Sequence, residues 1–236
     1  MPPSPESVDV AALSARLADI DERIAQAARD VGRAPSSLTR IVVTKFHPAA
    51  LVTALADLGV CDVGENRQQE LTAKRAELPD LDVDWHFIGQ LQTKKARAVR
   101  AAASIVHSVD RGRVADALDA AAEASDPVLD VLLQVNLTAD PGRGGVAPED
   151  LAELAEHVAD RRSLRVRGIM AVAPLEEPPA AAFARLAAFS DVVRATVPDA
   201  DWISAGMTAD FAEAIAAGAT HLRIGSAITG PRPDRG

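Results

Sequence analysis

The sequence predicts a (β/α)8 barrel of the TIM type. Eight short apolar or β-branched runs alternate with Ala-rich stretches that are long enough for helices. Strands that alternate with helices pair in parallel through right-handed crossovers. Eight such units fit a closed barrel better than an open doubly wound sheet, which usually stops at five or six strands. The predicted strands cover residues 39–44, 60–63, 85–89, 105–109, 131–136, 166–172, 202–204 and 221–225.

An additional helix is predicted ahead of the first strand. Over residues 8–32, apolar side chains from Val10 to Ala27 recur three and four positions apart, and Gly32 stands where a C-terminal cap belongs. No break in composition marks a second domain. We therefore interpret residues 1–236 as one domain, with this helix at about 8–32 and the barrel at about 38–230.

Composition limits the classes of protein to consider. The chain has 236 residues, of which 48% are hydrophobic, but only 5 Phe, 2 Trp and no Tyr, so its core must be aliphatic. A net charge of -9 argues against nucleic-acid binding, while small anionic ligands stay possible. The single cysteine, Cys61, cannot form an internal disulfide. No Cys/His cluster has metal-ligand spacing, so no metal site is expected.

The expected location is the cytoplasm. Residues 1–10 contain acidic residues and prolines instead of the basic and apolar segments of a secretory signal. No apolar run is long enough to span a membrane. The sequon at Asn136 is therefore interpreted as a chance match.

Polar residues at the ends of the first three strands are the first candidates for a site, because barrel enzymes carry their chemistry there. Lys45 closes the first strand. It is either a lysine with a solvated ammonium or an amine desolvated enough to form a Schiff base. Asn66 follows the second strand and either contacts a ligand ring or belongs to a helix-capping turn. His86, in the third, is interpreted as a core histidine.

The loops after the seventh and eighth strands are predicted to hold a phosphate. Small residues there lead into helices, whose first amides and positive dipole end favour an anion. Thr208 is the expected N-cap of the helix that follows the seventh strand. The residues concerned are Ser204, Gly206, Met207, Thr208, Gly225 and Ser226.

A lysine and a phosphate site at one barrel mouth indicate pyridoxal 5'-phosphate (PLP) as the ligand. Arg223 lies two residues before Gly225 and should project from the same face of its strand. If its guanidinium reaches the pyridine nitrogen, that nitrogen stays unprotonated beside a permanent cation. The alternative role for Arg223 is to pair with a buried carboxylate.

These strand ends, in this order, resemble the YggS/PROSC family of PLP homeostasis proteins. The resemblance covers about residues 10–232 and is specific as an ordered combination. Its motifs are VVTK (42–45), VGENRQQE (63–70), WHFIGQLQ (85–92), SVDR (108–111), VNL with a following GG (135–145), GIMAVAP (168–174), ISAGMTADFAEAI (203–215) and LRIGSAITG (222–230).

The resemblance implies a barrel like the N-terminal domain of alanine racemase, with PLP held as an internal aldimine on Lys45. It implies that Asn66 lies near the cofactor ring, that Arg223 faces the pyridine nitrogen, and that the loop residues named above surround the phosphate. The implied role is to bind, buffer and deliver PLP, with little or no catalysis. Apo PLP-dependent enzymes are the implied recipients, and the chain is expected to be a monomer or weak dimer.

Three positions depart from the family pattern. The family more often has Asn than Lys94, Lys than Arg143, and Phe than Thr229. We expect none of the three to touch the aldimine or the phosphate, and we interpret Lys94 with Lys95 as a solvated pair at a helix start.

Two enzymes are alternatives to a carrier. An amino-acid racemase of the alanine racemase type needs a base on each face of the aldimine, and the resemblance supplies the second base as a Tyr from another domain. This chain has no Tyr, and Cys61 or His86 would have to replace it. A class I aldolase would carry its lysine on the sixth strand, where residues 166–172 contain none.

Overall fold

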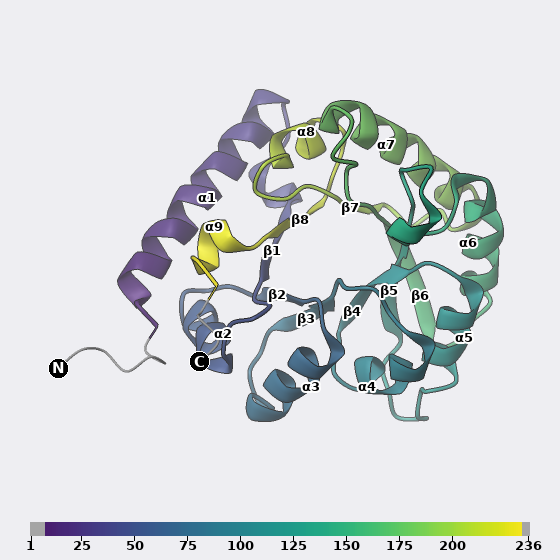
Figure 1. Ribbon diagram of the computed structural model, residues 1–236, viewed down its shortest axis with the longest axis horizontal. Coiled ribbons are helices and arrows are strands. Elements are labelled where there is room, and N and C mark those ends of the chain that lie inside the picture. The colour runs from purple at the N-terminus through teal and green to yellow at the C-terminus, as the bar shows by residue number, and fades with distance from the viewer. Residues whose placement is uncertain (1–7, 233–236) are drawn as a thin grey trace.

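The computed structural model describes residues 8–232, and its central feature is a closed barrel of eight parallel strands (Figure 1). The strands follow one another around the barrel in chain order, and the eighth pairs with the first. The predicted fold class is confirmed. The strands are β1 (Thr39–Val43), β2 (Asp62–Glu65), β3 (Asp84–Phe87), β4 (Ile105–Val109), β5 (Leu129–Gln134), β6 (Leu164–Met170), β7 (Trp202–Ser204) and β8 (His221–Ile224).

Helices surround the barrel on the outside (Figure 1). Each strand from β1 to β7 is followed by at least one helix that returns the chain to the start of the next strand, as parallel pairing requires. They are α1 (Val10–Asp30), α2 (Ala49–Asp57), α3 (Gln68–Glu77), α4 (Ala96–Arg100), α5 (Gly112–Asp119), α6 (Leu151–Ala159), α7 (Pro179–Thr196), α8 (Phe211–Ala216) and α9 (Ser226–Thr229).

The additional N-terminal helix packs on its own barrel. The Asp9 carboxylate caps α1 by accepting the N–H of Ala12 at 3.0 Å. The helix lies against α8 and α9, and Arg16 donates to the carbonyl of Ile228 in α9 at 2.7 Å. Helix α1 therefore helps to hold the short segment after β8. Its buried face consists of Leu13, Leu17, Ile20, Ile24 and Ala28.

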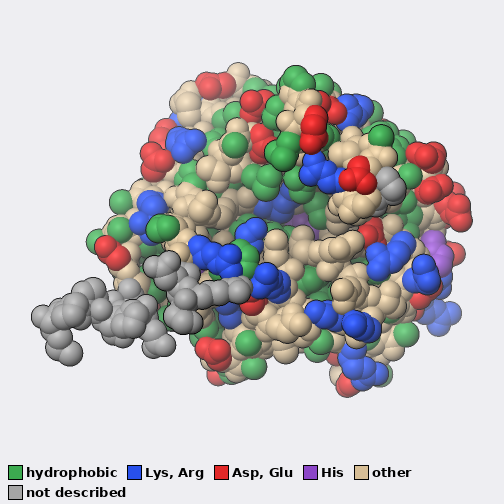
Figure 2. Space-filling model, viewed as in Figure 1, with side chains coloured by type: hydrophobic (Ala, Val, Ile, Leu, Met, Phe, Trp, Pro, Cys, Tyr) green, Lys and Arg blue, Asp and Glu red, His purple; other side chains and the backbone are tan. Residues whose placement is uncertain are grey.

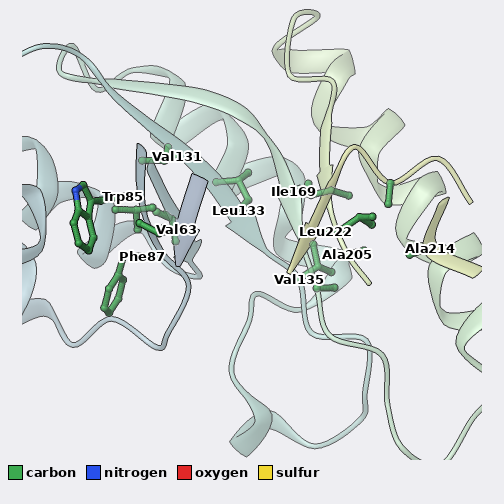
Figure 3. Close-up of a cluster of buried hydrophobic side chains, with 14 of the residues drawn as sticks. Val63, Trp85, Phe87, Val131, Leu133, Val135, Ile169, Ala205, Ala214 and Leu222 are labelled. Carbon is green, nitrogen blue, oxygen red and sulfur yellow. The ribbon is translucent and has the colours of Figure 1, made fainter. Parts of the chain in front are cut away.

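The strands bury an aliphatic layer on the outside of the barrel and a more polar one inside. Outward side chains such as Val63, Leu133 and Leu222 pack beneath the helices, as Figure 3 shows. The inside of the barrel instead contains buried His86 and His107. The aliphatic core was predicted from composition. Of the two histidines inside the barrel, only His86 was predicted to be a core residue.

Two further observations bear on the sequence expectations. Within residues 8–232, no helix is both long and apolar enough to cross a membrane. In the same part of the chain, no group of three or more His, Cys, Asp or Glu residues could hold a metal ion. Residues 1–7, which entered the argument against a secretory signal, lie outside the described residues.

Gly168 lies where the backbones of strands β6 and β7 approach each other most closely at a glycine. An added Cβ there would lie 1.8 Å from the carbonyl oxygen of Trp202 on the paired strand β7. We expect Gly168→Ala to lower the free energy of unfolding by about 3 kcal/mol or more, because strand backbones would have to separate. Gly32→Ala, at a left-handed position with open space, should cost only about 1 to 2 kcal/mol. Urea denaturation of both variants measures the difference, and equal losses would contradict the close approach.

Candidate functional site

A cavity of about 500 Å³ opens at the carboxyl ends of the strands. Its walls come from the turn after β1, the loops after β2, β3, β6 and β7, strand β8, and the segment from Gly225 to Arg232. Lys and Arg side chains gather near the middle of the same face (Figure 2). Of the nine predicted site residues, seven line this cavity: Lys45, Asn66, Met207, Thr208, Arg223, Gly225 and Ser226.

Lys45 occupies a turn that ends strand β1. The N–H of His47 donates to the carbonyl of Thr44 at 3.1 Å, so Lys45 and Phe46 are the two central residues of a β-turn. Phe46 has a φ of 72°, a conformation that usually requires glycine at this position of a turn. Its N–H donates to the Glu70 carboxylate at 2.7 Å, which helps to hold the strained residue.

The ring of Phe46 also joins two arginines at the rim of the cavity. The guanidinium carbon of Arg67 lies 5.0 Å from the ring centre, and that of Arg232 lies 3.8 Å from it. Lys45 Nζ is 5.9 Å from the same centre. These cation–π contacts bring the C-terminal segment to the turn that carries Lys45.

A buried ion pair supports this turn from outside the barrel. Lys74 of α3 pairs with Glu65 of β2, and both side chains are nearly inaccessible to solvent. The Lys74 ammonium also donates to the Thr44 carbonyl at 2.8 Å, and the Thr44 hydroxyl donates to Glu65 at 2.6 Å. Burial raises the pKa of Glu65, and Lys74 opposes part of that rise. These contacts hold Thr44, and the next residue, Lys45, lines the cavity.

Arg223 forms part of the cavity wall from strand β8, and its side chain is almost fully buried. It donates to the hydroxyl of Ser204 at 2.7 Å and to the carbonyl of Ala171 at 2.8 Å. Burial lowers the pKa of Arg223 to about 10, and Asp210 opposes this effect. The guanidinium is therefore still cationic at neutral pH. Neither of its hydrogen-bond acceptors is a carboxylate, contrary to the alternative of a buried ion pair.

Asn66 is fixed at the cavity by the neighbouring loop. An added Cβ at Gly89 would lie 1.9 Å from the Asn66 carbonyl oxygen, so only glycine fits there. The turn after β2 is thus packed directly on the loop after β3. The Asn66 side chain does not cap α3, whose N-cap is Arg67.

The loop after β7 differs from the sequence interpretation at Thr208. Thr208 lies in a turn and is not the N-cap of the following helix, which begins at Phe211 with Asp210 as its N-cap. The Asp210 carboxylate accepts the N–H of Met207 at 2.6 Å and so folds the turn back on itself. Asp210, two positions later, therefore occupies the N-cap position that was predicted for Thr208. Thr208 nevertheless lines the cavity, from this turn.

Two predicted residues lie beneath the cavity surface instead of on it. Ser204 is fully buried, and its hydroxyl is shared between Arg223 and His107. Gly206, at a φ of 90°, packs against Ala214 of α8, where a Cβ would approach the Ala214 side chain to 2.7 Å. Both residues shape the site, and neither is among its lining residues.

The three departures from the family pattern lie in different places. Lys94 is exposed within the short 3-10 helix Thr93–Lys95, as expected of a solvated pair with Lys95. Arg143 is 3.5 Å from the Glu176 carboxylate. Thr229 is buried and lines the cavity through α9; that it touches neither the aldimine nor the phosphate stays a prediction.

The chain is similar to a known protein family over nearly its whole length. The family model described as "Alanine racemase, N-terminal domain" matches residues 15–233. A "Pyridoxal phosphate homeostasis protein" from Pseudomonas aeruginosa is 41% identical over 224 residues, covering 93% of this chain and 96% of the relative. The Escherichia coli protein of the same name is 36% identical, covering 92% and 95%. This chain belongs to the pyridoxal phosphate homeostasis protein family.

Solved structures agree with membership of the PLP homeostasis family. PipY from Synechococcus elongatus with PLP bound has a TM-score of 0.81 at 33% identity, covering 92% of this chain and all of that one. Alanine racemase from Corynebacterium glutamicum has a TM-score of 0.67 at 15% identity and is matched over 61% of its length. The second similarity shows the fold alone. The predicted family resemblance is confirmed.

The buried pair beneath the Lys45 turn leads to a stability prediction. Lys74→Met leaves the Glu65 carboxylate buried without its counter-charge, so we expect the free energy of unfolding to fall by about 3 to 5 kcal/mol. The double variant Glu65→Leu/Lys74→Met removes both charges and should recover more than half of that loss. Urea denaturation tests both. A double variant no more stable than Lys74→Met would show that the charge pairing is not the cause.

Proposed function

We propose that this protein holds PLP in the cavity as an internal aldimine on Lys45 and serves as a buffer and carrier of the cofactor. The observation that carries the proposal is that Lys45 and Arg223 line one cavity with the loops after β7 and β8. Its volume of about 500 Å³ is typical of a small-molecule site. The names of the relatives and the PLP-bound PipY structure support the same ligand.

The donor set suits each part of the cofactor. The Lys45 amine would attack the aldehyde carbon, form a C=N bond and release water. Ser226 and Ala227 begin α9 ahead of its first hydrogen bonds, which Ile228 and Thr229 donate to Gly225, so their amides are available to phosphate oxygens. Asn66 after β2 and Arg223 in β8 also line the cavity, and we propose that they contact the ring.

The arrangement favours storage over catalysis. Racemisation needs a second proton-transferring group on the face of the cofactor opposite the lysine. The chain has no Tyr, and the two substitutes considered from sequence are misplaced. Cys61 lines a separate hollow with Pro35 and Gly59, at the amino end of β2. His86 is buried in the barrel interior and engaged with other side chains.

The role defines the partners that we propose. Apo enzymes that need PLP would receive it from this protein in the cytoplasm, and a monomer or weak dimer would leave the mouth of the barrel accessible to them. The cavity opens on the surface that carries Arg67 and Arg232. Anionic PLP would be attracted to that rim.

Borohydride reduction tests the attachment to Lys45. PLP-loaded protein should show an aldimine absorbance band and, after reduction, a covalent adduct on the peptide that contains Lys45. Lys45→Ala should abolish both, and Lys45→Arg should do the same although it keeps the charge. Lys95→Ala is the matched control and should retain them. An adduct that persists in Lys45→Ala would refute the assignment.

Turnover with alanine separates the carrier from the racemase. Loaded protein incubated with D- or L-alanine should show no inversion approaching the 1 to 1000 per second that is typical of enzymes. Chiral chromatography of the amino acid over time measures the rate. Sustained inversion in that range, lost in Lys45→Ala, would identify an enzyme and overturn the carrier role.

A further inference from the structure

The peptide groups on both sides of Lys45 are held by one helix outside the barrel. The N–H of Phe46, which follows Lys45, donates to Glu70 Oε2 at 2.7 Å. The carbonyl of Thr44, which precedes it, accepts from Lys74 Nζ at 2.8 Å. Glu70 and Lys74 are four positions apart on α3 and so lie on the same face of that helix. Helix α3 thus binds the main chain of the lysine turn at two points.

The contact with Glu70 depends on the type of the turn. The carbonyl of Thr44 also accepts the N–H of His47 at 3.1 Å, a bond that closes turns of type I and type II alike. The two types differ in the peptide between the central residues, which they place in opposite orientations. Phe46 has a φ of 72°, as the second central residue of a type II turn does, and its N–H then points to Glu70. In a type I turn the same N–H would point away from α3.

Phe46 does not favour this form of the turn by itself. Within residues 8–232 it is the one residue other than glycine that has a positive φ. A Cβ atom disfavours that region of backbone conformation, whereas a type I turn accepts most residues. A contact outside the turn must therefore stabilise the strained form. The Glu70 carboxylate provides it, because it receives the Phe46 N–H only in that form, and the contacts of the ring with Arg67 and Arg232 add to it.

The type of the turn also affects the direction of the Lys45 side chain. Rotation of the peptide moves the carbonyl carbon that is bonded to the Lys45 Cα, so the Cα–Cβ bond tilts with it. The four-carbon stem of lysine amplifies this tilt at Nζ. An amine must come within about 3 to 3.5 Å of the atom that it attacks, and a misplacement of about 1 Å can slow a reaction by about 100-fold. In the strained form, Lys45 lines the cavity.

Glu70 lies behind the turn and not at the cavity surface. Its side chain is 23% exposed, and its Oε1 is 3.6 Å from Nη1 of Arg67. It is not among the residues that line the cavity, so it reaches Lys45 only through the backbone of Phe46. A carboxylate in the first turn of a helix also stabilises that helix. Stabilisation of α3 alone would be a purely structural role.

We propose that Glu70 is a positioning residue, which selects the strained form of the turn and so directs the Lys45 amine into the cavity before the ligand arrives. The inference rests on the proposed function, in which this amine bonds to PLP. The amine nitrogen attacks the aldehyde carbon, a C=N bond forms, and the aldehyde oxygen leaves as water with the two amine protons. Glu70 takes no part in that chemistry. It sets the fraction of molecules in which the amine is in place.

The form of the turn can be measured without any ligand. In NMR spectra of the apoprotein, the Phe46 amide should exchange slowly with solvent and should show the strong intraresidue contact with its α proton that marks a positive φ. Glu70→Ala should lose both signals, whereas Glu70→Gln keeps an acceptor oxygen and should retain them. The amides of Val42 and Val43 show whether strand β1 is intact in each variant. A protected Phe46 amide with a positive φ in Glu70→Ala would overturn the selection by Glu70.

Mixing the apoprotein with PLP measures the effect on Lys45. Glu70→Ala should slow the appearance of the aldimine band by at least about tenfold, the fold-change that corresponds to one hydrogen bond to a charged group. The PLP analogue with a methyl group in place of the aldehyde cannot react with the amine, and its Kd should stay within about threefold of the wild-type value. Glu77→Ala removes an exposed carboxylate from the same helix and should change neither quantity. A wild-type rate in Glu70→Ala would refute the positioning role.

A glycine in place of Phe46 separates positioning from a structural role. Glycine adopts a positive φ without strain, so the turn of Phe46→Gly does not need Glu70 to stay in the type II form. Adding Glu70→Ala to Phe46→Gly should therefore change the rate by less than about threefold. If Glu70 only stabilised α3 or the fold, its loss would slow the reaction equally in both backgrounds. That result, or a Glu70→Gln variant as slow as Glu70→Ala, would contradict selection through the hydrogen bond.

Two further arrangements keep the outcome decisive. Circular dichroism shows whether each variant is folded, and if Glu70→Ala is not, Glu70→Met takes its place because it keeps the length of the side chain without an oxygen acceptor. Failure of the Lys45 adduct test would refute the proposed function and leave the NMR result standing. An adduct on Lys45 that forms at the wild-type rate without Glu70 would refute this inference alone.

Discussion

The pairing of β8 with β1 is the constraint on which the site depends. Its register sets Ile41 opposite Arg223 and Val42 opposite Ile224. Lys45 and Arg223 are far apart in sequence, and closure of the barrel brings them to the same end of adjacent strands. The loop after β8 lies beside the turn after β1 for the same reason, and α1 secures it by binding the carbonyl of Ile228. The cavity thus requires the whole barrel to be assembled before it exists.

Charge is buried on both sides of the barrel wall, and the two cases are handled differently. Outside, Glu65 and Lys74 neutralise each other directly, at a desolvation cost that makes their net contribution to stability small while the loss of either one is severe. Inside, Arg223 donates to a hydroxyl and a backbone carbonyl and has no carboxylate among its hydrogen-bond partners. A cation that is not hydrogen-bonded to a carboxylate can still attract an anionic or hydrogen-bond-accepting group in the cavity.

The sequence predicted features that depend on periodicity and on position in the fold. The strand count, the N-terminal helix and the location of Lys45 at a strand end follow from alternating apolar runs. What it could not predict depends on contacts between distant segments. Nothing local indicates that Phe46 adopts a left-handed conformation, because Glu70 and Arg232 help to hold it there. Ser204 was predicted to contact the phosphate because the sequence does not show whether a side chain at a strand end points into the barrel interior or towards the cavity. The strand register decides this, and Ser204 is buried in the interior.

The position of Cys61 has a practical consequence. It is an exposed free thiol, it is the only cysteine in the sequence, and it lies at the amino end of β2. The cavity opens at the carboxyl ends of the strands, with the length of the barrel between the two. A fluorescent label on this thiol would therefore sit on the opposite end of the molecule from Lys45. Energy transfer from such a label to a light-absorbing ligand in the cavity would report binding and release of that ligand in real time. The residues that line the cavity would stay unmodified.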